Sequence, residues 1–424
     1  MVNAVQKPSV LVISTKRWPI PVRIATALAN AGFSVAAISP FRNFFGRTRA
    51  VDRRYFYRVG ARPGAIVRAI EDWSPDLLIC ADDQSVKELH RLHIRASNGQ
   101  QTEPAARLVK LIERSLGDPQ GFEFTQRKSK LLSLAKALGV RCPPTVFISS
   151  QQVEKQLEAA TYPVLVKADG SWGGKFVRIV ESARQARTTI CEFQLPGNWP
   201  TTLREFLARF MPPWMVQWRS GDLPAVCLQD FVHGSPANRA VVCWEGRVLA
   251  GLSVRVHKTV YTFGPASLVE IIDSPEMTET ANTLVNHLKL SGLVGFDFVL
   301  DSENQAWLIE MNPRVTPVSY LGRSDDTNLS AALFSKLTGT NRPSRFSDAK
   351  GKLIALFPQE LQRSPHSEFI STGYDDVPWE DPELVLALLN SVLRNGLLKR
   401  LGMRRRNRQN SIIQKLQQNS SELT

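Results

Sequence analysis

The stretch from residue 295 to residue 314 constrains the fold more than any other part of the chain. It reads GFDFVLDSENQAWLIEMNPR, two runs of alternating residues around a short polar break. That pattern predicts an antiparallel β-hairpin with its loop at residues 302–305. In this register Asp297 faces Glu310 on one side of the hairpin. The other side would carry an apolar core face made of Phe296, Phe298, Leu300, Trp307, Ile309 and Met311.

The polar side of this hairpin predicts a metal site. Two carboxylates that face each other across a strand pair repel by roughly 0.2–1 kcal/mol even when solvated. A divalent cation between Asp297 and Glu310 would remove that repulsion, and Asn312 on the same side adds an amide oxygen. Such hard oxygen ligands suit Mg²⁺ (or Mn²⁺), and Mg²⁺ usually keeps positions open for substrate phosphates. The alternative is a solvated acidic end without a metal.

The two strands of the hairpin resemble a known signature. FDF at 296–298, followed after the loop by LIEMNPR at 308–314, resembles the metal-binding motif of the ATP-grasp superfamily. That superfamily includes carbamoyl-phosphate synthase, biotin carboxylase and D-alanine–D-alanine ligase. The resemblance implies that Glu310 and Asn312 hold the metal ions and that Asp297 replaces the first acidic ligand. It also implies that Arg314 faces a phosphate or acyl phosphate.

A glycine-rich stretch at 162–178 reads YPVLVKADGSWGGKFVR, a buried-type strand followed by a loop. Glycine lets backbone N–H groups approach anionic oxygens closely. The spacing fits neither a Walker A loop nor a G-x-G-x-x-G turn. The resemblance implies that Lys167 contacts the α- and β-phosphates of ATP and that the loop covers the triphosphate. The predicted phosphate-binding residues of this stretch are Lys167, Gly170, Ser171, Gly173 and Gly174.

The resemblance implies that two other segments contact the nucleotide. An amphipathic helix is predicted over residues 125–139, and the lysine that opens the corresponding family helix falls on Lys128. A predicted strand at 225–232 corresponds to the hinge that holds adenine. Residues 235–239 contain no acid, so the family's ribose contact is not assigned. The predicted adenine-binding residues are Gln229, Asp230, Phe231 and Val232.

The alternating stretch 253–259 places Arg255 and His257 on one face of a strand and Lys258 on the other. In ATP-grasp ligases, cations at this point approach the γ-phosphate or the carboxylate that is activated. The resemblance therefore implies catalytic roles for Arg255, His257 and Lys258 beside Arg314. For His257, a structural histidine inside a sheet is the equal alternative.

The first part of the chain alternates predicted strands and helices, which indicates a parallel sheet with right-handed crossovers. Sites in such sheets lie beyond the carboxyl ends of the strands. Residues 14–17, 39–42 and 82–83 would therefore lie at one edge. Predicted strands are 10–13, 33–38 and 76–80, and predicted helices are 22–31, 64–73 and 84–92.

The resulting fold class combines α/β and α+β parts. Residues 1–120 would form an N-terminal parallel α/β (pre-ATP-grasp) domain. A two-lobed ATP-grasp fold with antiparallel sheets follows. Its first lobe, 121–225, contains the glycine-rich loop and a Trp/Pro-rich insertion, and its second lobe, 226–340, contains the metal hairpin. Residues 341–424 would be a C-terminal extension with a basic tail.

Composition adds limits on location and partners. The five cysteines are widely spaced, and no apolar run approaches the roughly 18–20 residues of a membrane span. We therefore expect a cytoplasmic protein without a transmembrane segment. Of the net charge of +14, eight positive charges lie between Arg394 and Lys415 with no acid among them. That tail is either solvated or contacts an anionic surface. The Trp- and Pro-rich residues 191–223 pack beneath a long loop or form a substrate wall or homodimer interface.

These features together predict an ATP-dependent ligase. It would use ATP and Mg²⁺ to convert a carboxylate into an acyl phosphate, which an amine, thiol or similar nucleophile attacks, and it would release ADP and phosphate. Two other classes stay open: a catalytically silent ATP-binding module, and a basic protein that binds nucleic acid or a membrane surface. The identity of the small-molecule carboxylate and of the nucleophile does not follow from the sequence.

Overall fold

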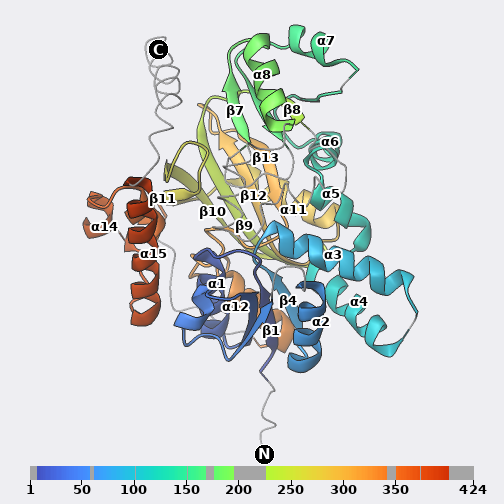
Figure 1. Cartoon of the computed structure of the whole chain (residues 1–424), viewed down its shortest axis with the longest axis vertical. Coiled ribbons are helices and arrows are strands. Elements are labelled where there is room, and N and C mark those ends of the chain that lie inside the picture. Colours follow the sequence, from blue (N-terminus) through green and yellow to red (C-terminus); the bar gives the residue numbers. More distant parts are fainter. Residues whose placement is uncertain are drawn as a thin grey trace, which may run out of the picture.

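The computed structural model describes residues 7–57, 62–100, 102–149, 151–168, 176–194, 226–340, 350–372 and 374–400. Three sheets form the framework: a parallel N-terminal sheet at one end, an antiparallel four-stranded sheet that contains β5–β8 at the other, and a seven-stranded sheet between them (Figure 1). The confirmed fold class is thus α/β and α+β. Three predicted features lie outside the described residues: the loop with Gly170, Ser171, Gly173 and Gly174, residues 195–223 of the Trp/Pro-rich stretch 191–223, and the basic tail beyond residue 400.

The N-terminal sheet is parallel, as the sequence predicts, with the strand order β3-β2-β1-β4. Gly32 ends α1 with φ 114°, a conformation that glycine adopts without strain. The sequence did not predict β3 or α4. The elements are β1 (Ser9–Ile13), α1 (Ile20–Ala31), β2 (Ser34–Pro40), η1 (Phe44–Arg47), β3 (Arg53–Tyr57), α2 (Arg62–Trp73), β4 (Leu77–Cys80), α3 (Asp83–Asn98), α4 (Glu103–Leu116) and η2 (Pro119–Gly121).

The four-stranded sheet at the other end of the molecule is antiparallel, with the order β5-β8-β6-β7. Apolar side chains of α7 and α8 pack against it. β8 belongs to this sheet although it follows residue 225, where the sequence suggests a boundary between lobes. The elements are β5 (Thr145–Phe147), α7 (Val153–Glu158), β6 (Val164–Ala168), β7 (Val177–Val180), α8 (Ala183–Gln194) and β8 (Val226–Asp230).

The seven-stranded sheet has the order β13-β12-β9-β10-β11-β14-β15. Side chains of α11 and α6 pack on one face of it, and those of α12 and α1 on the other. The helix predicted over 125–139 is in fact two helices, separated by the extended residue Arg127. The elements are α5 (Phe122–Gln126), α6 (Lys128–Ala137), β9 (Ser235–Trp244), β10 (Arg247–Thr259), β11 (Ala266–Ile272), α11 (Pro275–His287), β12 (Gly292–Leu300), β13 (Ala306–Asn312), α12 (Leu329–Thr338), β14 (Leu353–Ala355) and β15 (Tyr374–Asp375).

The hairpin of β12 and β13 contains a bulge that the sequence did not predict. The register shifts by one residue after Asp297, so that Phe298 pairs with Leu308. Leu308 is therefore fully buried. The prediction that Trp307 and Ile309 face the core is wrong, because the shift turns both toward the other side, where they are only half-buried.

The C-terminal elements pack back onto the N-terminal sheet. Arg23 of α1 donates from Nη2 to the carbonyl oxygen of Asp376 at 2.8 Å and also pairs with its carboxylate. Leu384 and Leu388 are fully buried in the same apolar core as β1 and α1. This anchors the last helix, which lies beside η1. The elements are α13 (Gln359–Arg363), α14 (Glu368–Thr372) and α15 (Pro382–Arg400).

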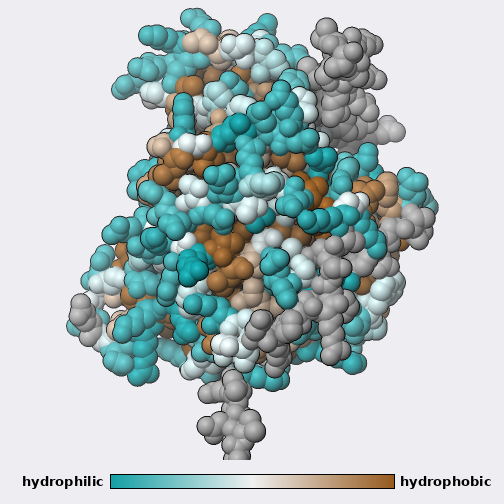
Figure 2. All heavy atoms as spheres, turned by 180° about the vertical axis from the view of Figure 1, so that it is seen from behind, coloured by the Kyte–Doolittle hydropathy of each residue, from teal (hydrophilic) through white to brown (hydrophobic). Residues whose placement is uncertain are grey.

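Figure 2 shows the rear of the molecule, where a largely hydrophilic surface is interrupted by apolar side chains across its middle. Within the described ranges, no helix combines the length and the apolar character that crossing a membrane requires.

Candidate functional site

The acidic end of the hairpin has the predicted geometry. Asp297 of β12 pairs directly with Glu310 of β13. Two amide groups hold the Asp297 carboxylate: Asn238 donates to Oδ1 at 2.6 Å and Asn312 donates to Oδ2 at 3.0 Å. Burial, and then the negative charge of Glu310, raises the pKa of Asp297 to about 6. The two acids therefore share one side of the hairpin and repel each other.

A close approach behind this end explains a glycine. Gly295 lies opposite Asn312, and a Cβ atom on Gly295 would stand 2.1 Å from Cγ2 of Thr316. Thr316 belongs to the turn after the hairpin. A hydrogen bond from its N–H to Ser319 Oγ, at 2.9 Å, holds its backbone in that turn. The glycine lets this turn lie directly against the strand and so sets the direction of the chain after residue 312.

Arg314 joins the hairpin to the N-terminal sheet. Its Nε donates to Asp83 Oδ1 at 2.7 Å and its Nη2 donates to Asn312 Oδ1 at 3.0 Å. The next residue, Val315, donates its N–H to the carbonyl of Cys80 at the end of β4. Burial opposes ionisation of Asp83, but the Arg314 guanidinium outweighs it and lowers the pKa of Asp83 to about 2. An ion pair between Arg314 and Asp83 thus connects the hairpin to the N-terminal sheet.

Two lysines reach the same place from the other side. Lys128, at the first turn of α6, lies with Nζ 3.0 Å from Oε2 of Glu310. Lys167 of β6 donates to Oε1 of Gln229, and Gln229 donates to Oγ1 of Thr145 at 2.9 Å. Burial, and then the neighbouring Lys128, lowers the pKa of Lys167 to about 8, although Glu310 and Asp297 act in the opposite direction. The two acids and the two lysines are therefore close enough to act on one another electrostatically within one site.

The edge of the parallel sheet forms a further wall. Asp82, after β4, accepts from the N–H of Thr15 at 2.6 Å and from its hydroxyl at 2.7 Å. Asn43, after β2, donates to the carbonyl of Lys16 at 2.9 Å. Burial lowers the pKa of Lys16, whose neighbours include Asp82 and Asp83. The loops after β1, β2 and β4 therefore meet at one edge, as the parallel topology predicts.

Several predicted residues have other contacts in this structure. Arg255 donates to Asn304 Oδ1 at 2.6 Å, in the loop of the hairpin. His257 lies with Nε2 2.8 Å from Oε2 of Glu270, and Lys258 is exposed beside a bulge. At the end of β8, Asp230 is exposed and Phe231 and Val232 are half-buried. The geometry assembles Asp297, Glu310, Asn312, Arg314, Lys128, Lys167 and Gln229. Arg255 and His257 of β10 have separate partners.

The ligand set at the hairpin is suited to a hard cation. Among the described residues, no group of three or more His, Cys, Asp or Glu could hold a metal ion by itself. Asp297 and Glu310 nevertheless offer two carboxylates, and Lys128 already supplies a positive charge to one of them. Asn312 Oδ1 accepts from Arg314, so its second lone pair is the one available to a cation. A cation held here would need further oxygens from a ligand.

Two residues of the site, Asn238 and Thr145, were not predicted, and neither was the pairing of Asp83 with Arg314. Asn238 pairs with Asp297 across β9 and β12, Thr145 fixes Gln229, and Asp83 fixes Arg314. Asp83 had been placed at the sheet edge, but its partner could not be foreseen. A polar residue within a strand, such as Asn238, belongs to no sequence pattern that would identify it as part of a site.

Comparison with known proteins identifies a matching domain in the second half of the chain. Residues 214–318 match the family model described as an ATP-grasp domain. This match and the curated relative described next support the ATP-grasp superfamily, the same family that the hairpin signature resembles.

One curated relative is the carbamoyl phosphate synthase large chain of Thermotoga petrophila, which is 25% identical over 235 residues. That match covers 54% of this chain and 20% of the relative, so it spans about a fifth of the relative's length.

Two solved structures share the fold. Biotin carboxylase from Campylobacter jejuni superposes with a TM-score of 0.55 at 17% identity, covering 83% of this chain and 75% of that one. N5-carboxyaminoimidazole synthetase from Staphylococcus aureus superposes with a TM-score of 0.54 at 13% identity, covering 82% of each chain.

Proposed function

We propose that this protein is an ATP-dependent ligase, which activates a carboxylate as an acyl phosphate for attack by an amine or similar nucleophile. One observation carries the proposal: the opposed acids Asp297 and Glu310 share a site with Lys128 and Lys167. Such a site can neutralise charge on a polyphosphate from several sides. The Staphylococcus aureus synthetase is described as complexed with ADP, which supports a nucleotide in the shared fold.

Different residues of the chain would bind different parts of MgATP. ATP with Mg²⁺ would supply the phosphoryl group. Asp297, Glu310 and Asn312 would hold the metal through oxygen atoms, and Lys128 would exchange its contact with Glu310 for phosphate oxygens. Lys167 and the glycine-rich loop would hold the α- and β-phosphates. Gln229 and the end of β8, with Asp230, Phe231 and Val232, would receive the adenine.

Electrostatic positioning is the main contribution of the protein in this proposal. A carboxylate oxygen of the substrate bonds to the γ-phosphorus while the bond to the ADP oxygen breaks. Arg314, held by Asp83, stays beside the new acyl phosphate. The nucleophile then attacks the acyl carbon, the bond to phosphate breaks, and the nucleophile loses its proton to solvent or to the leaving phosphate. Arg255, His257 and Lys258 remain proposed contacts to the reacting groups.

The affinity for MgADP should be highest between about pH 6 and about pH 8. Asp297, with its pKa raised to about 6, loses its charge below that pH and attracts the cation less. Lys167, with its pKa lowered to about 8, loses its charge above that pH and attracts the phosphates less. Isothermal titration calorimetry across this range measures both limbs.

Two variants show which residue causes each decline in MgADP affinity. Lys167→Arg keeps a positive charge at all these pH values, so the decline above pH 8 should disappear. Asp297→Asn should retain only the acid dependence that comes from the nucleotide's own ionisation. An alkaline decline that is unchanged in Lys167→Arg would show that another group causes it.

A screen for ADP release tests the proposed function. Purified protein is incubated with MgATP, pooled carboxylates and pooled amines or thiols, and ADP is measured by a coupled assay. We expect release that requires one member of each pool. MgADP binding without any turnover would favour a catalytically silent module. If MgADP does not bind at all, the proposal is wrong.

A further inference from the structure

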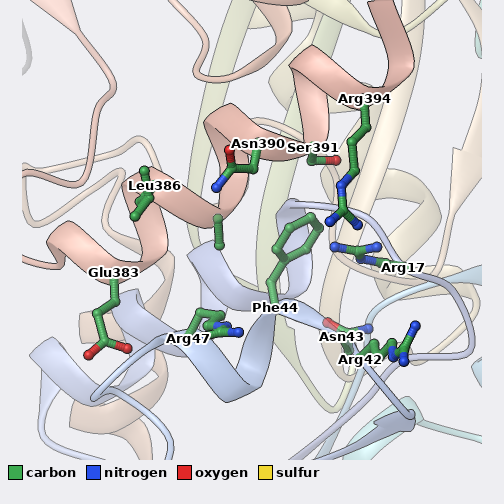
Figure 3. Close-up of a pocket in the computed structure, with 11 residues that line it drawn as sticks. Arg17, Arg42, Asn43, Phe44, Arg47, Glu383, Leu386, Asn390, Ser391 and Arg394 are labelled. Atoms are coloured by element: carbon green, nitrogen blue, oxygen red, sulfur yellow. The ribbon is translucent and has the colours of Figure 1, made fainter. Parts of the chain in front are cut away.

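A cavity lies between the N-terminal sheet and the last helix. It has a volume of about 730 Å³, and four arginines line it: Arg17, Arg42, Arg47 and Arg394. Figure 3 shows Arg17 and Arg394 reaching toward one another from opposite walls, one from the loop after β1 and the other from α15. Glu383, at the start of α15, is the one acid among the lining residues and lies at the far side of the cavity.

Arg17, Arg42 and Arg394 lie close enough to repel one another. Within the described residues, none of the four forms an ion pair with a carboxylate. Burial, and then repulsion by Arg394 and Arg42, lowers the pKa of Arg17. The ring of Phe44 lies 4.9 Å from the Arg17 guanidinium and holds it in place. A surplus of like charge in a concave site attracts anions and is stabilised by binding them.

The walls of the cavity belong to anchored elements. Phe44 is buried beneath it, and the fully buried Leu384 and Leu388 fix α15 to the core. Asp381, just before α15, accepts from the N–H of Arg49 at 3.3 Å, which ties the helix to the segment after η1. Anchored elements therefore fix the backbone positions from which these four exposed arginines line the cavity.

The cavity adjoins the candidate active site through the edge of the parallel sheet. Arg17 directly follows Lys16, whose carbonyl accepts from Asn43, and Asn43 also lines the cavity. Lys16 in turn lies near Asp83, the partner of Arg314. A substrate that extends from Arg314 along this edge would reach the arginines next.

We propose that this cavity binds the remote anionic end of the substrate, a phosphate or a pair of carboxylates carrying at least two negative charges. Guanidinium groups bind both in bidentate fashion, and four of them match several oxygens at once. That the anion belongs to the substrate rests on the proposed ligase function, whereas the capacity of the cavity to bind an anion does not.

Direct binding tests the cavity without any need for turnover. Full-length protein is titrated with inorganic pyrophosphate and, separately, with citrate. The double variant Arg17→Gln/Arg394→Gln should weaken binding of both by at least about tenfold, because it removes two charged donors. The matched control Arg68→Gln/Arg95→Gln removes the same charge from exposed positions on α2 and α3 and should leave binding unchanged.

Glu383→Gln provides a test that damage to the fold cannot imitate. It removes the one acid of the lining, so both anions should bind more tightly. An undetectable affinity in the unmodified protein, or an equal loss in the double variant and its control, would overturn the proposal.

A separate measurement distinguishes this proposal from the ligase function. MgADP affinity should be the same in the double variant and the unmodified protein. If MgADP fails to bind the unmodified protein, the ligase proposal falls and the anion titrations alone decide about the cavity. If the screen identifies a substrate without a second anionic group, the assignment of the cavity to the substrate is wrong.

Discussion

Glu310→Gln should lower the rate of ADP release by at least about 10²–10³-fold while the protein stays folded. The substitution keeps the size and shape of the side chain but removes the charge that faces Asp297 and that contacts Lys128. A metal ion held between the two positions would lose one of its anionic ligands. The rate is measured with the carboxylate and nucleophile that give the highest activity in the screen.

The control for this variant is Glu303→Gln, the same chemical change at an exposed position in the loop of the same hairpin. It should leave the rate within about twofold, since surface substitutions have small effects. Lys167→Ala should also abolish turnover, and Lys136→Ala on the exposed side of α6 is its control. Unaltered ADP release from Glu310→Gln or Lys167→Ala would remove the basis of the site assignment.

Asp376→Ala should lower the free energy of unfolding by about 3–5 kcal/mol, because it leaves a buried guanidinium without its partner. Arg23 pairs with the Asp376 carboxylate, and both side chains are less than a tenth exposed. The same carboxylate accepts from the hydroxyl of Tyr320 at 2.6 Å and from the N–H of Phe357 at 3.4 Å. Urea-induced unfolding measures the loss.

An exposed ion pair offers the contrast. Asp273 lies 3.0 Å from Lys350, and both side chains are about 70% exposed. Asp273→Ala should cost less than about 1 kcal/mol, because water screens such pairs. Equal costs for Asp376→Ala and Asp273→Ala would mean that the buried cluster contributes no more than a surface pair.

The hairpin could be predicted because two local signals agree: its alternation and its polar break. The bulge after Asp297 could not, since residues 307–309 are all apolar and fit either register equally well. The N-terminal parallel sheet was predicted from alternation of strands and helices. Its edge strand β3 was missed because it begins with the exposed, charged Arg53 and Arg54, which hide a short strand.

The site itself was predicted unevenly. Lys128 and Lys167 came from family resemblance, and the structure brings both to the acids. The partners Asn238 and Thr145 depend on strand pairing between distant segments, which no local spacing encodes. Arg394 was counted with a basic tail. It lies in α15, in agreement with the helix predicted over residues 383–397, but the packing of that helix against η1, which brings the residue near Arg17, could not be predicted.

The contact between Arg23 and Asp376 joins positions 353 residues apart, and one apolar core contains residues from Val10 to Leu388. The segments that carry the family motifs are consequently not interchangeable modules. A chimera that transplants residues 121–340 into a related protein would have to rebuild this shared interior as well. Specificity engineering is therefore better confined to side chains at the sheet edge and in the arginine-lined cavity than to exchange of whole segments.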